Sequence, residues 1–180
     1  LERTSSTRTP LNWKSKYGSV VVTIYEGAAA DGMNEKGLVA NLLYLAESKY
    51  PAEDAADKRP TLSIAAWVQY VLDSYATTAE AVEGLRKEAF RVVPILAPTG
   101  EPGTVHLSVS DASGDSAIFE YIDGRLRIHH GRQYQVMTNS PTFDAQLNLA
   151  KYWETIGGAT MLPGTNRASD RFARASYYIN

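Results

Sequence analysis

The 180-residue sequence contains no cysteine, so it can form neither a disulfide nor a thiolate metal site. A formal net charge of -2, with Lys and Arg scattered, argues against nucleic acid or an anionic membrane as the main partner. The apolar runs are far too short to span a bilayer, and residues 1–10 lack the apolar stretch of a signal peptide. The remaining composition, 44% hydrophobic and 21% charged, is ordinary for a globular chain that buries a sizeable core as one domain.

Familiar catalytic motifs are absent as well. The sequence has no G-x-S-x-G nucleophile elbow, no S-x-x-K, no H-E-x-x-H and no phosphate loop ending in Gly-Lys-Ser/Thr. His129 and His130 are adjacent in a predicted strand, so their side chains point to opposite faces and cannot chelate one metal together. His106 opens another predicted strand and has no partner at ligand spacing. The sequence therefore predicts neither a metal nor a cofactor.

Short β-branched and aromatic runs, separated by Gly, Pro and Asp turn signals, predict the strands. The predicted strands are Ser19–Tyr25, Leu38–Leu45, Arg91–Leu96, His106–Asp111, Ala117–Ile122, Leu126–His130 and Gln135–Thr138. The last five have the spacing of an antiparallel meander. Residues 1–10 are predicted as a flexible lead-in, and Tyr50–Pro60 as an exposed loop.

Apolar residues at helical spacing predict four helices. These are Ile64–Tyr75, Thr77–Glu88 with Thr77 and Glu80 as a capping box, a helix capped by Thr142 that reaches Trp153, and a last one that starts at Ser169. The first two are joined by almost nothing, so they are expected to pack together on one sheet face. Strands with two separate helical groups indicate an α+β domain built in layers.

One stretch is suited to chemistry by its own residues. Val136–Asp144 (VMTNSPTFD) is expected to contain a strand end, a tight turn and a helix start within nine residues. A carboxamide fixed there, that of Asn139, could direct two N–H donors at a developing negative charge. An Asx cap of the following turn explains Asn139 nearly as well from the residues alone.

This stretch and others resemble signatures of the choloylglycine hydrolase family, which includes bile salt hydrolases and penicillin V acylases. The resemblance covers nearly the whole chain from about residue 11 to residue 180, with three signatures in the expected order and spacing. The three signatures are Asp31–Leu38 (DGMNEKGL), Thr138–Phe143, and Leu162–Gly164 followed by Ala168–Phe172. In addition, Asn12-Trp13 with Ser15–Val20 resembles an early strand of the family, and Ser108–Tyr121 resembles its central hairpin.

The resemblance implies a fold and a mechanism. Family members are N-terminal-nucleophile amidases, so the expected fold is a partial αββα sandwich of antiparallel sheets. Residues 11–180 would be the central part of a single domain that is truncated at both ends. In the family, the thiolate of an N-terminal Cys attacks a linear amide, with its own α-amino group as the base. That Cys, with an Arg and an Asp that orient it, would lie before Leu1.

The resemblance also implies roles for three residues of this chain. Tyr44 would contribute a backbone N–H to the oxyanion hole, and Asn139 would contribute its carboxamide. Arg171 would sit beside the nucleophile, where a fixed cation lowers the pKa of a thiol. Without the resemblance, Arg171 would be interpreted as an exposed helix residue, because Asp170 and Arg174 flank it. The three are expected to converge in one pocket.

Tyr44 bears on the substrate. Bile salt hydrolases of the family usually carry Asn at this place, whereas penicillin V acylases can carry Tyr, and Asn41–Leu45 resembles their Gram-negative branch. Those relatives cleave phenoxyacetyl amides and N-acyl homoserine lactones and are exported to the periplasm. The resemblance thus implies a penicillin V acylase-like amidase, periplasmic or secreted, with a small-molecule amide substrate and a homo-oligomeric assembly. A bile salt hydrolase is the alternative.

Other interpretations stay open. The chain could be a non-catalytic relative that kept the fold as a binding module, or part of a longer enzyme. A weaker hypothesis makes Ser5, Ser6 or Thr7 a new N-terminal nucleophile after cleavage, although the Arg and Asp that should follow are missing. In each case the 180 residues alone are expected to lack enzymatic amide hydrolysis, because no thiolate is present.

Overall fold

The computed structural model describes residues 9–25, 27–96, 100–154 and 161–179. Their largest element is a six-stranded antiparallel sheet of order β1-β2-β3-β6-β7-β8. Its strands are β1 (Ser19–Ile24), β2 (Ala28–Asn34), β3 (Val39–Tyr44), β6 (Val105–Ser110), β7 (Ser116–Ile122) and β8 (Arg125–His130). A second, small sheet pairs β4 (Thr61–Ser63) with β5 (Arg91–Val93) in parallel.

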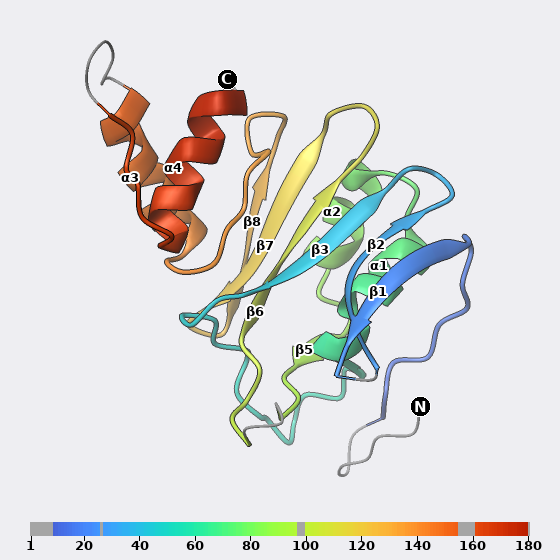
Figure 1. The fold of residues 1–180 in the computed structure, drawn as a ribbon. Coiled ribbons are helices and arrows are strands. Elements are labelled where there is room, and N and C mark those ends of the chain that lie inside the picture. Colours follow the sequence, from blue (N-terminus) through green and yellow to red (C-terminus); the bar gives the residue numbers. More distant parts are fainter. Residues whose placement is uncertain (1–8, 26, 97–99, 155–160, 180) are drawn as a thin grey trace.

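Four α-helices and one short 3-10 helix complete the described elements. They are η1 (Ile64–Ala66), α1 (Trp67–Ser74), α2 (Thr78–Arg86), α3 (Phe143–Glu154) and α4 (Ala168–Ile179). In Figure 1, α1 and α2 lie on one face of the large sheet, while α3 and α4 pack together beside β8. None of the helices among the described residues is long and apolar enough to cross a membrane.

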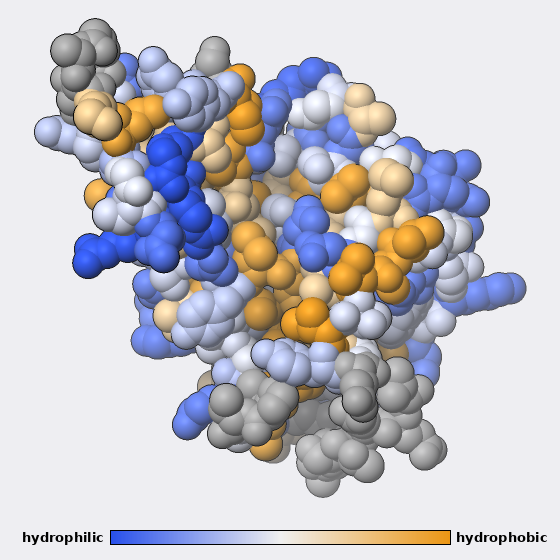
Figure 2. Space-filling view, viewed as in Figure 1, coloured by the Kyte–Doolittle hydropathy of each residue, from blue (hydrophilic) through white to orange (hydrophobic). Residues whose placement is uncertain are grey.

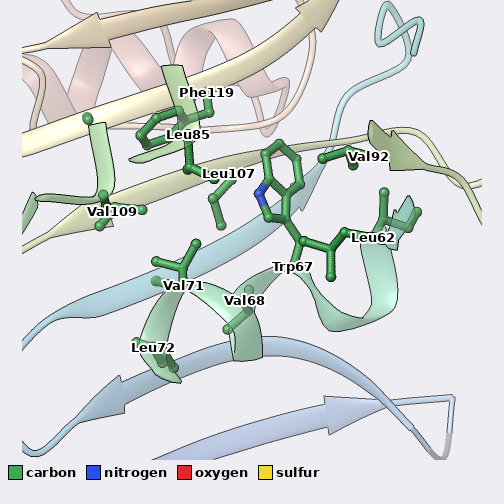
Figure 3. Close-up of a cluster of buried hydrophobic side chains, with 14 of the residues drawn as sticks. Leu62, Trp67, Val68, Val71, Leu72, Leu85, Val92, Leu107, Val109 and Phe119 are labelled. Atoms are coloured by element: carbon green, nitrogen blue, oxygen red, sulfur yellow. The ribbon is translucent and has the colours of Figure 1, made fainter. Parts of the chain in front are cut away.

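The main core lies between the sheet and the helix pair α1/α2. Because side chains alternate along a strand, every second residue of the central strands faces the helices. Trp67 of α1, Leu107 of β6 and Phe119 of β7 are fully buried there, and Figure 3 shows them packed together. The shared placement of α1 and α2 on one sheet face, expected from the short connection, is confirmed.

The opposite face of the sheet is largely open at β1 and β2. Val20, Val22 and Met33 are more than half exposed, and Figure 2 shows apolar residues gathered on this face. The register places Asp31 opposite Asn41, and this polar pair is joined by a 2.8 Å hydrogen bond from the Asn41 Nδ2. The described residues thus contribute one antiparallel sheet, with its helix pair, to the expected sandwich.

The DGMNEKGL stretch forms the β2–β3 hairpin. Its Asn34 side chain accepts hydrogen bonds from the N–H groups of Lys36 and Leu38, and its Nδ2 donates to the Leu72 carbonyl at the end of α1. Gly37 has a φ of 81°, a conformation that favours glycine. This signature therefore has a structural role here: it closes a hairpin and attaches it to α1.

The α+β class with a large antiparallel sheet is confirmed, and so is the Thr77 cap, whose hydroxyl accepts from the Glu80 N–H. Two strand predictions are wrong. Residues 91–96 do not join the meander, because Arg91–Val93 pairs in parallel with β4. Residues 135–138 form no strand, since the chain leaves the sheet after β8 and crosses to α3. Sequence reasoning also missed β2. The predicted lead-in falls mostly on residues 1–8, which lie outside the described residues.

Candidate functional site

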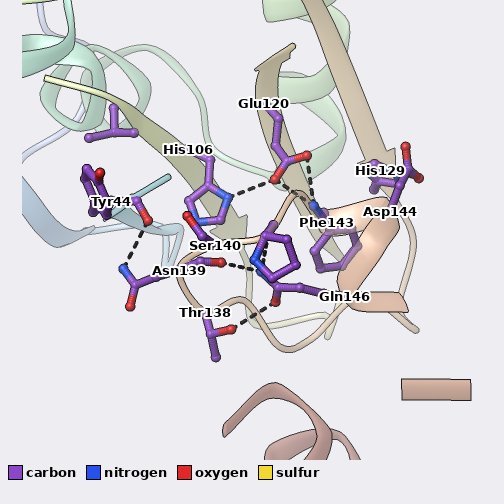
Figure 4. A network of polar contacts seen from close by, with 12 residues as sticks. Tyr44, His106, Glu120, His129, Thr138, Asn139, Ser140, Phe143, Asp144 and Gln146 are labelled. Carbon is purple, nitrogen blue, oxygen red and sulfur yellow. Dashed lines mark hydrogen bonds and ion pairs between the residues drawn. The ribbon is translucent and has the colours of Figure 1, made fainter. Parts of the chain in front are cut away.

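The candidate site lies at the end of β3, where two distant parts of the chain meet it. The Asn139 Nδ2 donates a 3.1 Å hydrogen bond to the Tyr44 carbonyl oxygen, across a sequence separation of 95 residues. The Arg171 Nη2 donates at 2.9 Å to the Asn139 Oδ1, across 32 residues. Figure 4 shows the first of these contacts. The convergence of Tyr44, Asn139 and Arg171 that the resemblance predicts is therefore present, while their catalytic role stays a prediction.

Arg171 determines which way the Asn139 carboxamide faces. A guanidinium has donors only, so the atom of Asn139 that meets it must be the oxygen, and the NH2 group must face β3. The NH2 group has two N–H bonds, and the Tyr44 carbonyl occupies one of them. Within the described ranges the Tyr44 carbonyl is the partner of this group, so its second N–H can meet another oxygen on this side of the strand.

The Tyr44 N–H points to the same side as its carbonyl. The next residue, Leu45, donates its N–H to the Thr104 carbonyl, so the pair formed by Tyr44 and Val105 is a non-hydrogen-bonded pair of the ladder. In such a pair the N–H and C=O groups face away from the neighbouring strand. The expected common direction of the Tyr44 N–H and the Asn139 carboxamide is consistent with this geometry.

Ser140 provides a second attachment between the same two segments. Its Oγ accepts a 3.0 Å hydrogen bond from the Ala46 N–H, two residues after Tyr44. The peptide bond between Ser140 and Pro141 is cis. Two hydrogen bonds thus hold the turn before α3 against the end of β3, one through Asn139 and one through Ser140.

Arg171 is an exposed residue of the first turn of α4, yet it is not held by its charged neighbours. Its Nε donates to the Asn166 carbonyl at 3.1 Å, and its Nη2 reaches Asn139. Asp170 accepts from the Thr165 hydroxyl, and Arg174 donates to the carbonyls of residues 163 and 165. The interpretation of Arg171 as an exposed helix residue is confirmed, and its Nη2 in addition contacts Asn139.

A buried side chain, Gln146, supports the turn from below, and sequence reasoning missed it. Its Nε2 donates to the carbonyl oxygens of Asn139 and Pro141, the latter at 2.6 Å. Its Oε1 lies 2.9 Å from the Thr138 Oγ1 (Figure 4). Gln146 has no exposed surface. A lone Gln within a predicted helix gave no signal of this role.

A second buried pair, His106 and Glu120, holds the start of α3. The His106 Nδ1 lies 2.9 Å from the Glu120 Oε1, and both side chains are essentially inaccessible to solvent. The Glu120 carboxylate also accepts the Phe143 N–H, at 2.9 and 3.1 Å. A carboxylate at a helix N-terminus satisfies a free backbone N–H and interacts favourably with the helix dipole. The sequence shows no partner for His106 at metal-ligand spacing, and its partner in the structure is the single carboxylate of Glu120.

The other two histidines have separate partners, as their adjacent positions predicted. The His129 Nε2 lies 2.8 Å from Asp144, and the His130 Nε2 lies 2.8 Å from Asp115. The hydrogen bond from His129, with a further contribution from Arg127, holds the pKa of Asp144 below its usual range. The contacts of Asp144 attach the first turn of α3 to β8 and form a half-exposed ionic group beside the site.

A pocket that holds all three site residues stays a prediction. A hollow of about 150 Å³ lies between α3, α4 and residues 132–136, and none of the three lines it. Within the described ranges, no group of three His, Cys, Asp or Glu could hold a metal ion. Ser5, Ser6 and Thr7 lie outside the described residues.

Comparison with known proteins identifies relatives of this arrangement. Residues 5–180 match the family described as linear amide C-N hydrolases, choloylglycine hydrolase family. A penicillin V acylase from Pectobacterium atrosepticum is 57% identical over 175 residues, which cover 94% of this chain and 46% of that protein. A bile salt hydrolase/transferase from Clostridium perfringens is 33% identical over 125 residues, 68% of this chain and 37% of the relative.

The structural comparison agrees. The solved structure of a penicillin V acylase from Agrobacterium tumefaciens superposes with a TM-score of 0.83 at 63% sequence identity, covering 92% of this chain and 49% of that one. The chain spans about half the length of these acylases. The fold thus matches about half of the solved acylase chain.

Proposed function

The chain belongs to the choloylglycine hydrolase family of linear amide C–N hydrolases, and we propose that the protein that contains it is an amidase acting on penicillin V. The single observation that carries this proposal is the contact series from Tyr44 through Asn139 to Arg171. It joins three separate elements at one strand end, and it orients a carboxamide whose second N–H can meet an oxygen.

The proposed chemistry assigns each residue a part. A thiolate attacks the amide carbonyl, and the carbonyl oxygen gains negative charge as the tetrahedral intermediate forms. Asn139 and the Tyr44 N–H donate hydrogen bonds to that oxygen. Arg171 holds the carboxamide with its NH2 group toward β3, and its charge favours anions near the site.

The nucleophile is proposed to come from a segment outside these 180 residues. The chain contains no cysteine, and it covers only about half of the related acylases. The open face of the sheet offers room for a further layer beside the site. The 180 residues alone are accordingly expected to show no enzymatic turnover. Export to the periplasm and homo-oligomeric assembly stay predictions from the resemblance.

Penicillin V is proposed over conjugated bile salts because the acylase relatives share far more residues with this chain than the bile salt hydrolase does. Tyr at position 44 supports the same choice, since an aromatic ring suits an aryl or acyl chain. The bile salt hydrolase similarity keeps glycine- and taurine-conjugated bile salts as the second candidate substrates. N-acyl homoserine lactones are a further candidate of the acylase type.

The test is hydrolysis by the whole protein as its gene encodes it. Penicillin V, a conjugated bile salt and an N-acyl homoserine lactone are compared by kcat/KM, with and without prior thiol alkylation. We expect release of phenoxyacetate that alkylation abolishes. Replacing Asn139 by Ala should lower kcat by about 10²- to 10³-fold, the usual cost of one oxyanion donor.

Each contrary result removes a different part of the proposal. Preference for a bile salt would overturn the substrate and leave the amidase mechanism in place. Turnover that survives alkylation would exclude a cysteine nucleophile. An unreactive whole protein with no cysteine would favour the non-catalytic binding module.

A further inference from the structure

We propose that Gln146 is a positioning residue for Asn139, fixing the turn that aims the carboxamide. The inference rests on the proposed function in one respect, that the Asn139 carboxamide is the group whose direction matters. Gln146 is fully buried, so it acts through the turn and not on a substrate.

The contacts of Gln146 bracket Asn139 on both sides. Its Nε2 donates to the carbonyl oxygen of Asn139 itself and, at 2.6 Å, to that of Pro141. Its Oε1 lies 2.9 Å from the Thr138 hydroxyl, on the residue before Asn139. One side chain therefore holds three of the four residues from Thr138 to Pro141. With the backbone fixed at these points, the direction in which the Asn139 side chain leaves it is fixed as well.

The chemistry of this place suits a primary amide. Two carbonyl oxygens face into the protein and need two donors, and a hydroxyl needs an acceptor. A glutamine supplies all of these from one planar group. A methionine of similar length would leave the two carbonyls without these donors, and a carboxylate would face two carbonyl oxygens.

Gln146 is itself held by the sheet. It is the fourth residue of α3, and its N–H donates to the Thr142 carbonyl. The first residue of that helix, Phe143, donates its N–H to the buried Glu120 carboxylate on β7. A continuous series of contacts thus runs from Glu120 through the first turn of α3 and Gln146 to Asn139 (Figure 4).

The same group of contacts reaches the helix that carries Arg171. The Thr138 Oγ1 also lies 2.9 Å from the carbonyl of Ala168, the first residue of α4, so its single proton is shared between two acceptors. Thr138 therefore connects Gln146 of α3 with the start of α4, close to the contact between Asn139 and Arg171. Displacement of the turn would weaken both contacts of the carboxamide.

The experiment uses the whole protein as its gene encodes it, with Gln146→Met, Asn139→Ala, the double variant and the control Gln69→Met. Gln69 lies on α1, on the other side of the sheet, and its Nε2 donates to Asp73 of the same helix and to Ser19 of β1. Against penicillin V, Gln146→Met should lower kcat by about 10- to 100-fold, because a small misplacement of a catalytic group has this effect. KM should change far less, and Gln69→Met should keep the parent kcat.

The double variant separates positioning from a general weakening of the fold. If Gln146 acts through Asn139, then Gln146→Met should cause no further loss once Asn139 is Ala. Multiplying losses, or an unchanged kcat in Gln146→Met, would overturn the proposal. Should Gln146→Met fail to fold, Thr138→Val removes one bond of the same group, and its smaller loss should likewise vanish in the Asn139→Ala background.

A second measurement needs no amidase activity. The side-chain NH2 pair of Asn139 is identified in an ¹⁵N spectrum by its disappearance in Asn139→Ala. Its hydrogens should exchange faster in Gln146→Met than in the parent or in Gln69→Met. Equal exchange rates would overturn the positioning role even in a protein that hydrolyses no amide, whereas absent turnover with faster exchange would overturn only the proposed function.

Discussion

The two faces of the large sheet are stabilised by different kinds of contact. On the α1/α2 face, the buried apolar residues form one large cluster. It contains members of the helices and of the central strands, Trp67 and Phe119 among them. On the α3/α4 face the buried apolar cluster of described residues has only four members, Ile118, Phe143, Ala150 and Phe172. On that side, polar contacts of Glu120, Gln146 and Asn139 also join α3 and the turn before it to the sheet.

This difference suits the task of each face. Apolar burial is strong but has no direction, so it stabilises a layer without fixing any one atom. Hydrogen bonds contribute less free energy each, but they define where a donor points. The candidate site lies on the face with fewer apolar contacts, where directional contacts fix a carboxamide.

The largest effect is expected from the apolar face. Replacing Trp67 by Ala should lower the free energy of unfolding by about 3–5 kcal/mol, because a fully buried indole leaves a cavity that the sheet cannot close. Denaturant unfolding of the whole protein measures this. Trp153→Ala, at a half-buried position near the end of α3, is the control and should cost clearly less. Equal losses would mean that the two faces do not differ as described.

A smaller and more local effect is expected from Glu120. Glu120→Ala leaves the Phe143 N–H and the His106 Nδ1 without their partner, which should cost about 1–3 kcal/mol. Amide hydrogen exchange should rise in α3 and in the turn before it, while α1 and α2 keep their protection. The exposed Glu83→Ala on α2 serves as the control. Equal loss of protection in α1 would show that the polar contacts support the whole sheet.

The sequence predicts those helices and strands that are specified by their own residues and immediate neighbours. Residues 20–24 are all β-branched and lie in β1, and Thr77 with Glu80 specifies the start of α2. Strand β2 was missed because its Ala-Ala-Ala-Asp-Gly run has low strand propensity. It is a strand because β1 and β3 pair with it on both sides, which no local pattern encodes.

The site shows the same limit. The resemblance identified Tyr44, Asn139 and Arg171, and the structure brings them into contact. The resemblance gave no indication of Gln146, which is one of several polar residues of α3, or of the Glu120 pair with His106, whose members are polar residues within strand patterns. Their partners lie on other elements, so their function becomes visible only after folding.

A third prediction concerns a polar contact on the apolar face. Thr77→Ala removes the hydroxyl that accepts the Glu80 N–H at the start of α2, and should cost about 1 kcal/mol of unfolding free energy. Thr77→Ser keeps the hydroxyl and should restore most of the loss. Because α2 is also held by apolar burial, the proposed amide hydrolysis should not change. A lost activity in Thr77→Ala would connect this face to the site.

The smallest effect is expected from Asp144, whose half-exposed carboxylate lies 2.8 Å from the His129 Nε2 and 3.1 Å from the Arg127 Nη1. Solvent screening limits such contacts, so Asp144→Asn should cost no more than about 1 kcal/mol at neutral pH, and less in high salt. The hydrogen bond from His129 lowers the pKa of Asp144 in the folded protein.

The sign of the pH dependence follows from that lowered pKa. The stabilising contribution is fully present above the pKa of an unfolded aspartate, about 3.9, and is lost as the pH falls through the lower folded value. The parent and Asp144→Asn should therefore differ at pH 7 and converge in strong acid, as followed by urea unfolding at a series of pH values. If the difference in unfolding free energy persists in acid, Asp144 contributes by packing and not by its charge. The α3/α4 face would then be stabilised by packing, as the α1/α2 face is.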